Sequence, residues 1–330
     1  MSTLGLNRFP AICRWIVIVA LLVAPHLARG TQWHATVGAQ SNNKGRQALA
    51  FLPNEIWIHE GDSITWKFAT DEIHTLTFLT AMQVRPPFPV GCPGFSSTPA
   101  AFDGSACVTT PPLTTGATFT VDFPQTGNFR FVCLVHENMT GVVHVLALSK
   151  ALPHGPEFYQ DAADDSTREL LSDVDADTRL PGREEHDGHH HVAVGRGEIS
   201  STPGGSNTLS VMRFMENITV IHAGQTVDWG SEDPITPHTI TFGTEPADPM
   251  PPSSNVTVDA DGALHATIHA VGDSVHSGFI IAAPQDRIGL PQSPLTPTRF
   301  RITFTRAGIY PYICALHDEL GMKGKIIVLP

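Results

Sequence analysis

Two sets of metal-binding side chains occur in the same order in the two halves of the chain. Each set begins with a histidine; a cysteine follows far downstream, then a second histidine three residues later and a methionine shortly after. The sets are His74, Cys133, His136 and Met139 in the first half, and His238, Cys314, His317 and Met322 in the second. Two imidazoles, one thiolate and one weak thioether suit a copper ion that cycles between Cu(I) and Cu(II).

The repetition of the set matters more than any single residue in it. An isolated Cys-x-x-His segment would more often be a buried cysteine beside an unrelated histidine. Here the complete set occurs twice, with the cysteine at the end of an expected strand and a glycine shortly after the set. Three of the four residues share one short loop, so their geometry should change little when an electron is gained or lost. The sequence therefore predicts two copper centres, one in each half.

The segments that carry these residues also repeat, which indicates a tandem duplication. Residues 56–66 and 74–78 return as residues 220–229 and 238–242, and residues 127–145 return as residues 308–328. We expect a first domain over residues 31–150 and a second over residues 191–330.

Apolar residues alternate with polar ones within each copy. Phe119, Val121 and Phe123 follow this pattern in the first copy, and residues 300–304 follow it in the second. A period of two is typical of half-buried β-strands, and closely spaced Gly, Pro, Asn and Asp residues indicate turns between them. The predicted fold class is all-β, with a sandwich or Greek-key barrel in each half.

At these ligand motifs the chain resembles the cupredoxins, the blue copper proteins. Cys133-x-x-His136-x-x-Met139 is similar to a short ligand loop of that family, and Cys314-x-x-His317-x-x-x-x-Met322 to a longer one. His-Thr-x-Thr-Phe, at residues 74–78 and 238–242, resembles the strand that supplies the first histidine. The resemblance covers both repeats, but neither residues 151–190 nor the inserts at about 81–117 and 244–297.

The resemblance implies two tandem cupredoxin-like Greek-key β-sandwich domains, each with one type 1 (blue) copper ion. It implies that His74, Cys133 and His136 bind the first copper and His238, Cys314 and His317 the second, with Met139 and Met322 as axial ligands. It also implies outer-sphere electron transfer to redox partner proteins through exposed edges of His136 and His317. The shorter loop to Met139 could place its sulfur differently and give the two centres unequal potentials.

Two further cysteines, Cys92 and Cys107, flank a Gly-, Pro- and Ser-rich insert of the first domain. A disulfide between them would brace this loop and contribute roughly 3 kcal/mol of stability. Free thiols are the alternative.

The N-terminus has the order of a secretory signal. Arg8 and Arg14 precede an apolar run over residues 15–24, and small residues follow up to Gly30. The alternative is a membrane anchor, but a span needs about 20 apolar residues. We therefore expect residues 1–30 to be a cleaved signal peptide and the mature protein to be periplasmic or secreted, with no stable membrane span.

Residues 151–190 form an acidic connector with 11 acidic and 3 basic side chains. Phe158, Ala162, Leu170 and Leu171 would line one face of a short helix within it, and we expect the remainder to be a solvated linker. Its histidines, His186 and residues 189–191, could capture metal or have no function. The net charge of −12 argues against a nucleic-acid partner.

The function predicted from these residues is that of an exported electron carrier and not an enzyme. Oxygen-reducing copper enzymes need several His-x-His pairs, and nitrite-reducing ones have a histidine directly before the ligand cysteine. Val132 and Ile313 occupy that position here. The alternatives are a copper-delivery protein that loads through the linker histidines, and a copper oxidoreductase assembled as an oligomer.

Overall fold

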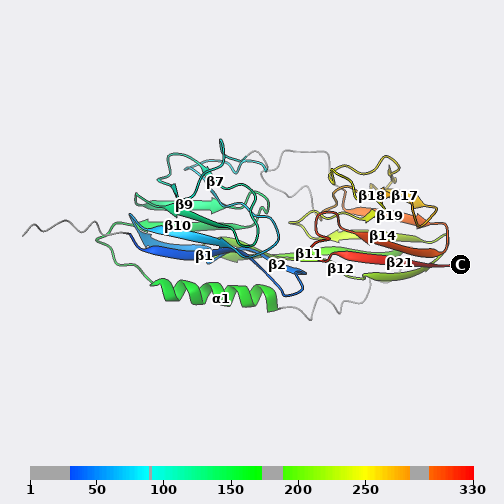
Figure 1. Cartoon of the computed structure of the whole chain (residues 1–330), viewed down its shortest axis with the longest axis horizontal. Coiled ribbons are helices and arrows are strands. Elements are labelled where there is room, and N and C mark those ends of the chain that lie inside the picture. Colours follow the sequence, from blue (N-terminus) through cyan, green and yellow to red (C-terminus); the bar gives the residue numbers. More distant parts are fainter. Residues whose placement is uncertain (1–29, 89–90, 173–188, 283–296) are drawn as a thin grey trace, which may run out of the picture.

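The computed structural model of the chain describes residues 30–88, 91–172, 189–282 and 297–330. Within this part the chain is nearly all β, with one helix, which confirms the predicted fold class of tandem β-sandwiches (Figure 1). In the same ranges, the structure contains no helix with the length and apolarity that a membrane crossing requires. Nearly all of the predicted signal peptide, and the linker residues 173–188 with His186, lie outside the described residues.

The first sandwich contains ten strands. They are β1 (Gln32–Gln40), β2 (Arg46–Leu52), β3 (Glu55–His59), β4 (Ser63–Phe68), β5 (Thr77–Phe78), β6 (Ala100–Ala101), β7 (Val108–Thr109), β8 (Thr118–Asp122), β9 (Gly127–Val132) and β10 (Thr140–Leu146). One layer has the order β2-β1-β4-β8-β6, and the other has the order β3-β10-β9-β5-β7.

The second sandwich repeats this arrangement. Its strands are β11 (His190–Thr202), β12 (Gly205–Phe214), β13 (Ile218–His222), β14 (Thr226–Glu232), β15 (Thr241–Phe242), β16 (Thr257–Val258), β17 (Leu264–Ile268), β18 (Val275–His276), β19 (Arg299–Phe304), β20 (Gly308–Ile313) and β21 (Lys323–Leu329). The layer β13-β21-β20-β15-β18 matches β3-β10-β9-β5-β7 strand for strand. His190 and His191, which the sequence placed in the linker, are the first residues of β11 and pair with β14.

The two sandwiches share a single sheet, which the sequence did not predict. Strand β12 pairs antiparallel with β2, and this pairing joins one layer of each sandwich into an eleven-stranded sheet. Ser210 lies opposite Gln47 in this pairing. The two residues occupy equivalent repeat positions, because each precedes the tryptophan of its own repeat, Trp66 or Trp229, by the same number of residues. The repeats are thus related by a local pseudo-twofold axis at this pair.

Each sandwich has its own apolar core. Trp66 is fully buried in the first core and contacts Phe78, Phe123 and Phe131 edge-on. Trp229 takes the equivalent place in the second. Burying a large apolar side chain stabilises a fold by about 1.5–3 kcal/mol, so the alternating residues of the two copies are sufficient to define both cores.

The connector contains one helix, α1 (Pro156–Ser172), which lies along the outer face of the first sandwich (Figure 1). The predicted helix is therefore present, and Leu170 and Leu171 pack against the sandwich as expected. At its N-terminal end the buried residues are Tyr159 and Ala163, whereas Phe158 is exposed and stacks on His154. The Tyr159 hydroxyl accepts a hydrogen bond from the Trp57 backbone N–H, which holds Tyr159 rather than Phe158 against the sandwich.

Cys92 and Cys107 form a disulfide, the first of the two alternatives that the sequence left open. The remaining described cysteines, Cys133 and Cys314, are free and buried. The disulfide closes the insert that carries β6, between the first histidine of the first set and its cysteine.

Polar contacts also cross the junction between the sandwiches. Asn54, 8% exposed, donates to the Thr202 hydroxyl at 2.5 Å and to the Thr140 carbonyl at 3.2 Å. The bond to Thr202 joins the turn after β2 to β11 of the second sandwich, and the bond to Thr140 joins it to β10 of the first. A buried polar group that loses its partner costs about 1–3 kcal/mol.

We predict that Asn54→Ala lowers the free energy of unfolding by about 1–3 kcal/mol, because the groups it now binds at the junction lose their partner. Urea unfolding measures the effect. The control is Asn255→Ala, which removes two exposed hydrogen bonds in the second sandwich and should change stability by less than about 0.5 kcal/mol. Equal effects of the two substitutions would contradict a structural role for the junction.

Candidate metal centres

The first candidate centre lies where the loop after β9 meets the strand-like segment at His74. His74 forms an isolated β-bridge with Leu113, Cys133 directly follows β9, and His136 lies in the turn before β10. The Nδ1 atoms of His74 and His136 are 3.1 Å apart, and both lie within 3.8 Å of the Cys133 sulfur. All three residues are buried.

The second candidate centre repeats this geometry. The Nδ1 atoms of His238 and His317 are 3.2 Å apart. The Cys314 sulfur lies 4.0 Å from the first of these atoms and 3.3 Å from the second. The structure thus brings together six of the eight residues predicted from the sequence as two buried groups of three.

The donor atoms fit a bound metal ion. Nitrogen and sulfur ligands at about 2.0–2.3 Å from one ion lie about 3–4 Å from one another, and all six separations fall in this range. Each group also directs two ring nitrogens and a sulfur at one point that water cannot reach. A single proton could satisfy only one of these contacts, whereas a soft cation satisfies all three.

The groups around both cysteines favour the thiolate form. Burial opposes ionisation, but the neighbouring imidazoles lower the pKa of Cys133 and of Cys314 well below the usual value. Backbone N–H groups of Thr75 and Thr239 also point at the two sulfurs, at 3.4 and 3.3 Å. Such bonds favour the charged form of the ligand.

The same two threonines fix the ligand loops. The hydroxyl of Thr75 accepts the Leu134 N–H at 2.7 Å, and that of Thr239 accepts the Ala315 N–H at 2.7 Å. Each bond ties the residue after the cysteine to the residue after the first histidine. The threonine of the His-Thr motif therefore sets the distance between the two ligand-bearing segments.

Met139 and Met322 are fully buried, each in the same apolar cluster as its cysteine. Their carbonyl oxygens accept the backbone N–H of Cys133 and Cys314, at 2.9 and 3.0 Å, which closes each loop. The role of the two sulfurs as weak axial ligands stays a prediction.

Two glycines make room for the first histidine of each group. A side chain at Gly38 would meet the Nε2 of His74 at 2.9 Å, and one at Gly195 would meet the Nε2 of His238 at 2.1 Å. Both have a positive φ, 68° and 62°. Glycine is required there for its backbone conformation and for the close approach of the ring.

The two centres differ in what holds the first histidine. The Nε2–H of His238 donates to the buried carboxylate of Asp233 at 3.3 Å, and Asp233 also accepts bonds from the Ser210 hydroxyl and two backbone N–H groups. Burial alone would lower the pKa of His238, but Asp233 and Cys314 raise it to about 9. Within the described ranges, the Nε2 of His74 has no hydrogen-bond partner.

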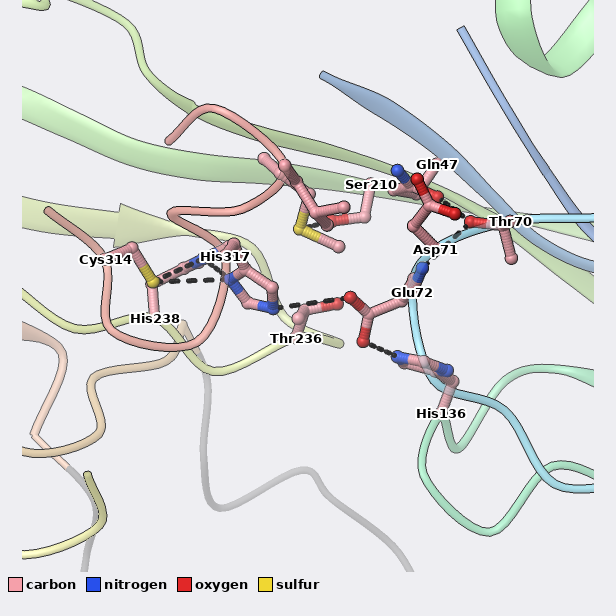
Figure 2. A network of polar contacts seen from close by, with 12 residues as sticks. Gln47, Thr70, Asp71, Glu72, His136, Ser210, Thr236, His238, Cys314 and His317 are labelled. Atoms are coloured by element: carbon pink, nitrogen blue, oxygen red, sulfur yellow. Dashed lines mark hydrogen bonds and ion pairs between the residues drawn. The ribbon is translucent and has the colours of Figure 1, made fainter. Parts of the chain in front are cut away.

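The expectation that His136 and His317 have exposed edges is wrong. They are 1% and 3% exposed, because the shared sheet turns the two ligand loops toward each other. Glu72 lies between them, with one oxygen 3.4 Å from the Nε2 of His136 and the other 3.7 Å from the Nε2 of His317 (Figure 2). Burial opposes ionisation of Glu72, but the three nearby histidines lower its pKa to about 2.

Neither Glu72 nor Asp233 was identified from the sequence. Glu72 precedes His74 by two residues, where the second copy has Thr236, and Asp233 precedes His238 by five. An acidic residue close to a ligand histidine was the available signal. In the part of the chain that the structure describes, the two His-Cys-His groups are the only clusters suited to a metal, and neither includes His190 or His191.

The comparisons with known proteins point to the same chemistry. Residues 38–146 match the model of copper-binding proteins of the plastocyanin/azurin family. No curated protein matches the chain. A reduced amicyanin mutant is 16% identical and covers 44% of this chain and 87% of its own, with a TM-score of 0.23. Oxidised plastocyanin from Dryopteris crassirhizoma is 18% identical and covers 42% and 99%, with a TM-score of 0.21. TM-scores this low do not support an argument. The assignment of the two groups as candidate copper centres therefore rests on the family match and on the geometry of the donor atoms.

We predict that Gly195→Ala weakens metal binding at the second group only, by about 10–100-fold, because the added methyl group displaces His238. Titration of the metal-free protein with Cu(II) measures both affinities. Gly224→Ala is the control, since Gly224 also has a positive φ, 92°, but its side chain would meet nothing within 4 Å. Two unchanged affinities in Gly195→Ala would contradict the assignment of His238 as a ligand.

Proposed function

Because residues 38–146 match the model of copper-binding proteins of the plastocyanin/azurin family, we propose that the chain is an exported electron-transfer protein with two type 1 copper centres. The observation that carries the proposal is the pair of buried His-Cys-His groups, of which the family match covers the first. The second has the same donor atoms, the same Cys-x-x-His spacing and the same threonine clamp. We extend the proposal to it on these grounds.

His74, Cys133 and His136 would hold the first copper, and His238, Cys314 and His317 the second. When bound, copper supplies a one-electron couple between Cu(I) and Cu(II). The protein keeps each thiolate ionised and excludes water from the three donors. It also keeps the loop histidines with Nδ1 toward the sulfur, because Glu72, which can only accept, faces Nε2.

Burial of all six donor residues favours a resident copper over copper in transit. A delivery protein exchanges its metal with an acceptor, which needs access to at least one ligand. His190 and His191, which the sequence placed in the linker, are strand residues and lie outside both groups. We propose a periplasmic or secreted location from the N-terminal sequence, and redox proteins of unidentified kind as partners.

We predict that Cys133→Ser and Cys314→Ser each remove one of two copper equivalents and half of the intense thiolate-to-copper absorption, because each removes the only thiolate of one centre. Metal analysis and visible spectroscopy of the copper-loaded protein check this. The double substitution of Cys92 and Cys107 by Ser should cost roughly 3 kcal/mol of stability and leave both centres intact. A colourless wild-type protein without copper under oxidising conditions would overturn the proposal.

We predict further that Asp233→Asn raises the reduction potential of the second centre and leaves the first nearly unchanged. The Asp233 carboxylate adds negative charge beside His238 and strengthens it as a donor, and both effects favour Cu(II). If the substitution weakens Cu(II) binding tenfold more than Cu(I) binding, the reduction potential rises by about 60 mV. Asp248→Asn, at an exposed aspartate of the same domain, is the control for charge alone in a spectroelectrochemical titration. A lowered potential in Asp233→Asn would refute this assignment.

A further inference from the structure

Glu72 is the one carboxylate that contacts both candidate centres among the residues described. Its two oxygens serve different domains: one faces His136 of its own domain at 3.4 Å, and the other faces His317 of the second domain at 3.7 Å. Glu72 is 7% exposed, so water screens neither contact strongly. A buried carboxylate is costly unless paired, and its ion-pair contacts in the described structure are with these two imidazoles.

Hydrogen bonds connect Glu72 to the shared sheet. Its backbone N–H donates to the Thr70 hydroxyl at 3.1 Å, and that hydroxyl donates to Gln47 on β2. Gln47 lies opposite Ser210 of β12 (Figure 2). The Ser210 hydroxyl donates to Asp233, the partner of His238. The network that positions Glu72 thus begins at the same pair of residues as the network that positions the second centre.

The arrangement favours one orientation of both loop histidines. The Glu72 oxygens lie 3.4 and 3.7 Å from the two Nε2 atoms, as ion-pair contacts longer than a good hydrogen bond. A carboxylate cannot donate a proton to them, so these contacts favour a proton on both Nε2 atoms. The Nδ1 atoms are then free to bind metal, and they are the atoms that face Cys133 and Cys314. Partners outside a ligand shell that fix a histidine's tautomer typically contribute 10–100-fold to metal affinity. Here a single side chain would make that contribution at two centres.

We propose that Glu72 is a positioning residue shared by both centres, and that His136, Glu72 and His317 form an internal path for electrons between the domains. This inference rests on the proposed function. In the transfer, one copper is oxidised from Cu(I) to Cu(II) and the other is reduced from Cu(II) to Cu(I). One electron moves, and no bond is made or broken.

The test compares Glu72→Gln with Asp71→Asn in the full chain. The amide that Glu72→Gln introduces has nearly the same size as the carboxylate, but it is neutral and can accept at only one end. Both imidazoles therefore lose the negative charge beside them, and at least one also loses its acceptor. Asp71 is the adjacent carboxylate, and it pairs with Lys44 at 2.7 Å on the surface. Asp71→Asn therefore supplies an equal loss of charge while the carboxylate between the two histidines stays in place.

In the metal-free protein, nitrogen NMR of the imidazoles should show a proton on Nε2 of both histidines, and Glu72→Gln should change both sets of signals. Titration with Cu(II) should show about 10–100-fold weaker binding at both centres in Glu72→Gln and little change in Asp71→Asn. Both reduction potentials should rise. After rapid one-electron reduction, transfer between the centres should be slower than in the wild type.

An effect on one centre alone, or equal effects of the two substitutions, would overturn the inference. If Glu72→Gln does not fold, Glu72→Asp keeps the charge but is one methylene too short to reach both rings, and it must alter at least one histidine and slow the transfer. The NMR result needs no copper. If the imidazole signals change as expected but the wild type binds no copper, the proposed function fails while the shared contact stands.

Discussion

The structure depends on one constraint: three electron-rich donor atoms meet in a space that water does not enter, and this happens twice. In the absence of a cation, the two Nδ1 atoms, 3.1 or 3.2 Å apart, and the neighbouring sulfur would leave lone pairs unsatisfied in the core. Leaving buried polar groups without partners costs free energy that the surrounding sandwich must supply. Bound copper would remove this cost, so the packing of each sandwich and the binding of a metal would stabilise each other.

The shared sheet gives the two centres their relation to each other. Pairing of β2 with β12 places equivalent residues of the two repeats opposite each other and brings the two ligand loops together. The edges of His136 and His317 that would otherwise meet solvent instead meet Glu72. The two repeats differ around these histidines in two ways. Thr236 occupies the place of Glu72 in the second repeat. Asp233 forms a hydrogen bond with His238 and with none of the other ligand histidines. Two nearly identical ligand sets thus lie in different electrostatic surroundings.

The sequence was sufficient for those features that depend on local patterns. Alternation at residues such as Phe119 and Val121 predicted strands, and repetition of the Cys-x-x-His set predicted the two centres, because each depends on spacing alone. The sequence could not predict which edge strands would pair. The burial of His136 and His317 and the role of Glu72 follow from that pairing, so they were missed or predicted wrongly. Leu170 and Leu171 pack as the apolar pattern predicted, but Tyr159 is buried in place of Phe158, because it bonds to a distant backbone group that the pattern does not reveal.

Electron paramagnetic resonance of the fully oxidised, copper-loaded chain tests most directly whether two copper centres face each other. We expect two Cu(II) ions per chain, each bound to a cysteine thiolate, with a dipolar interaction between them because their loop histidines contact a common carboxylate. A single Cu(II) equivalent, or two spins that are magnetically isolated from each other, would contradict the claim that the chain holds two copper centres face to face.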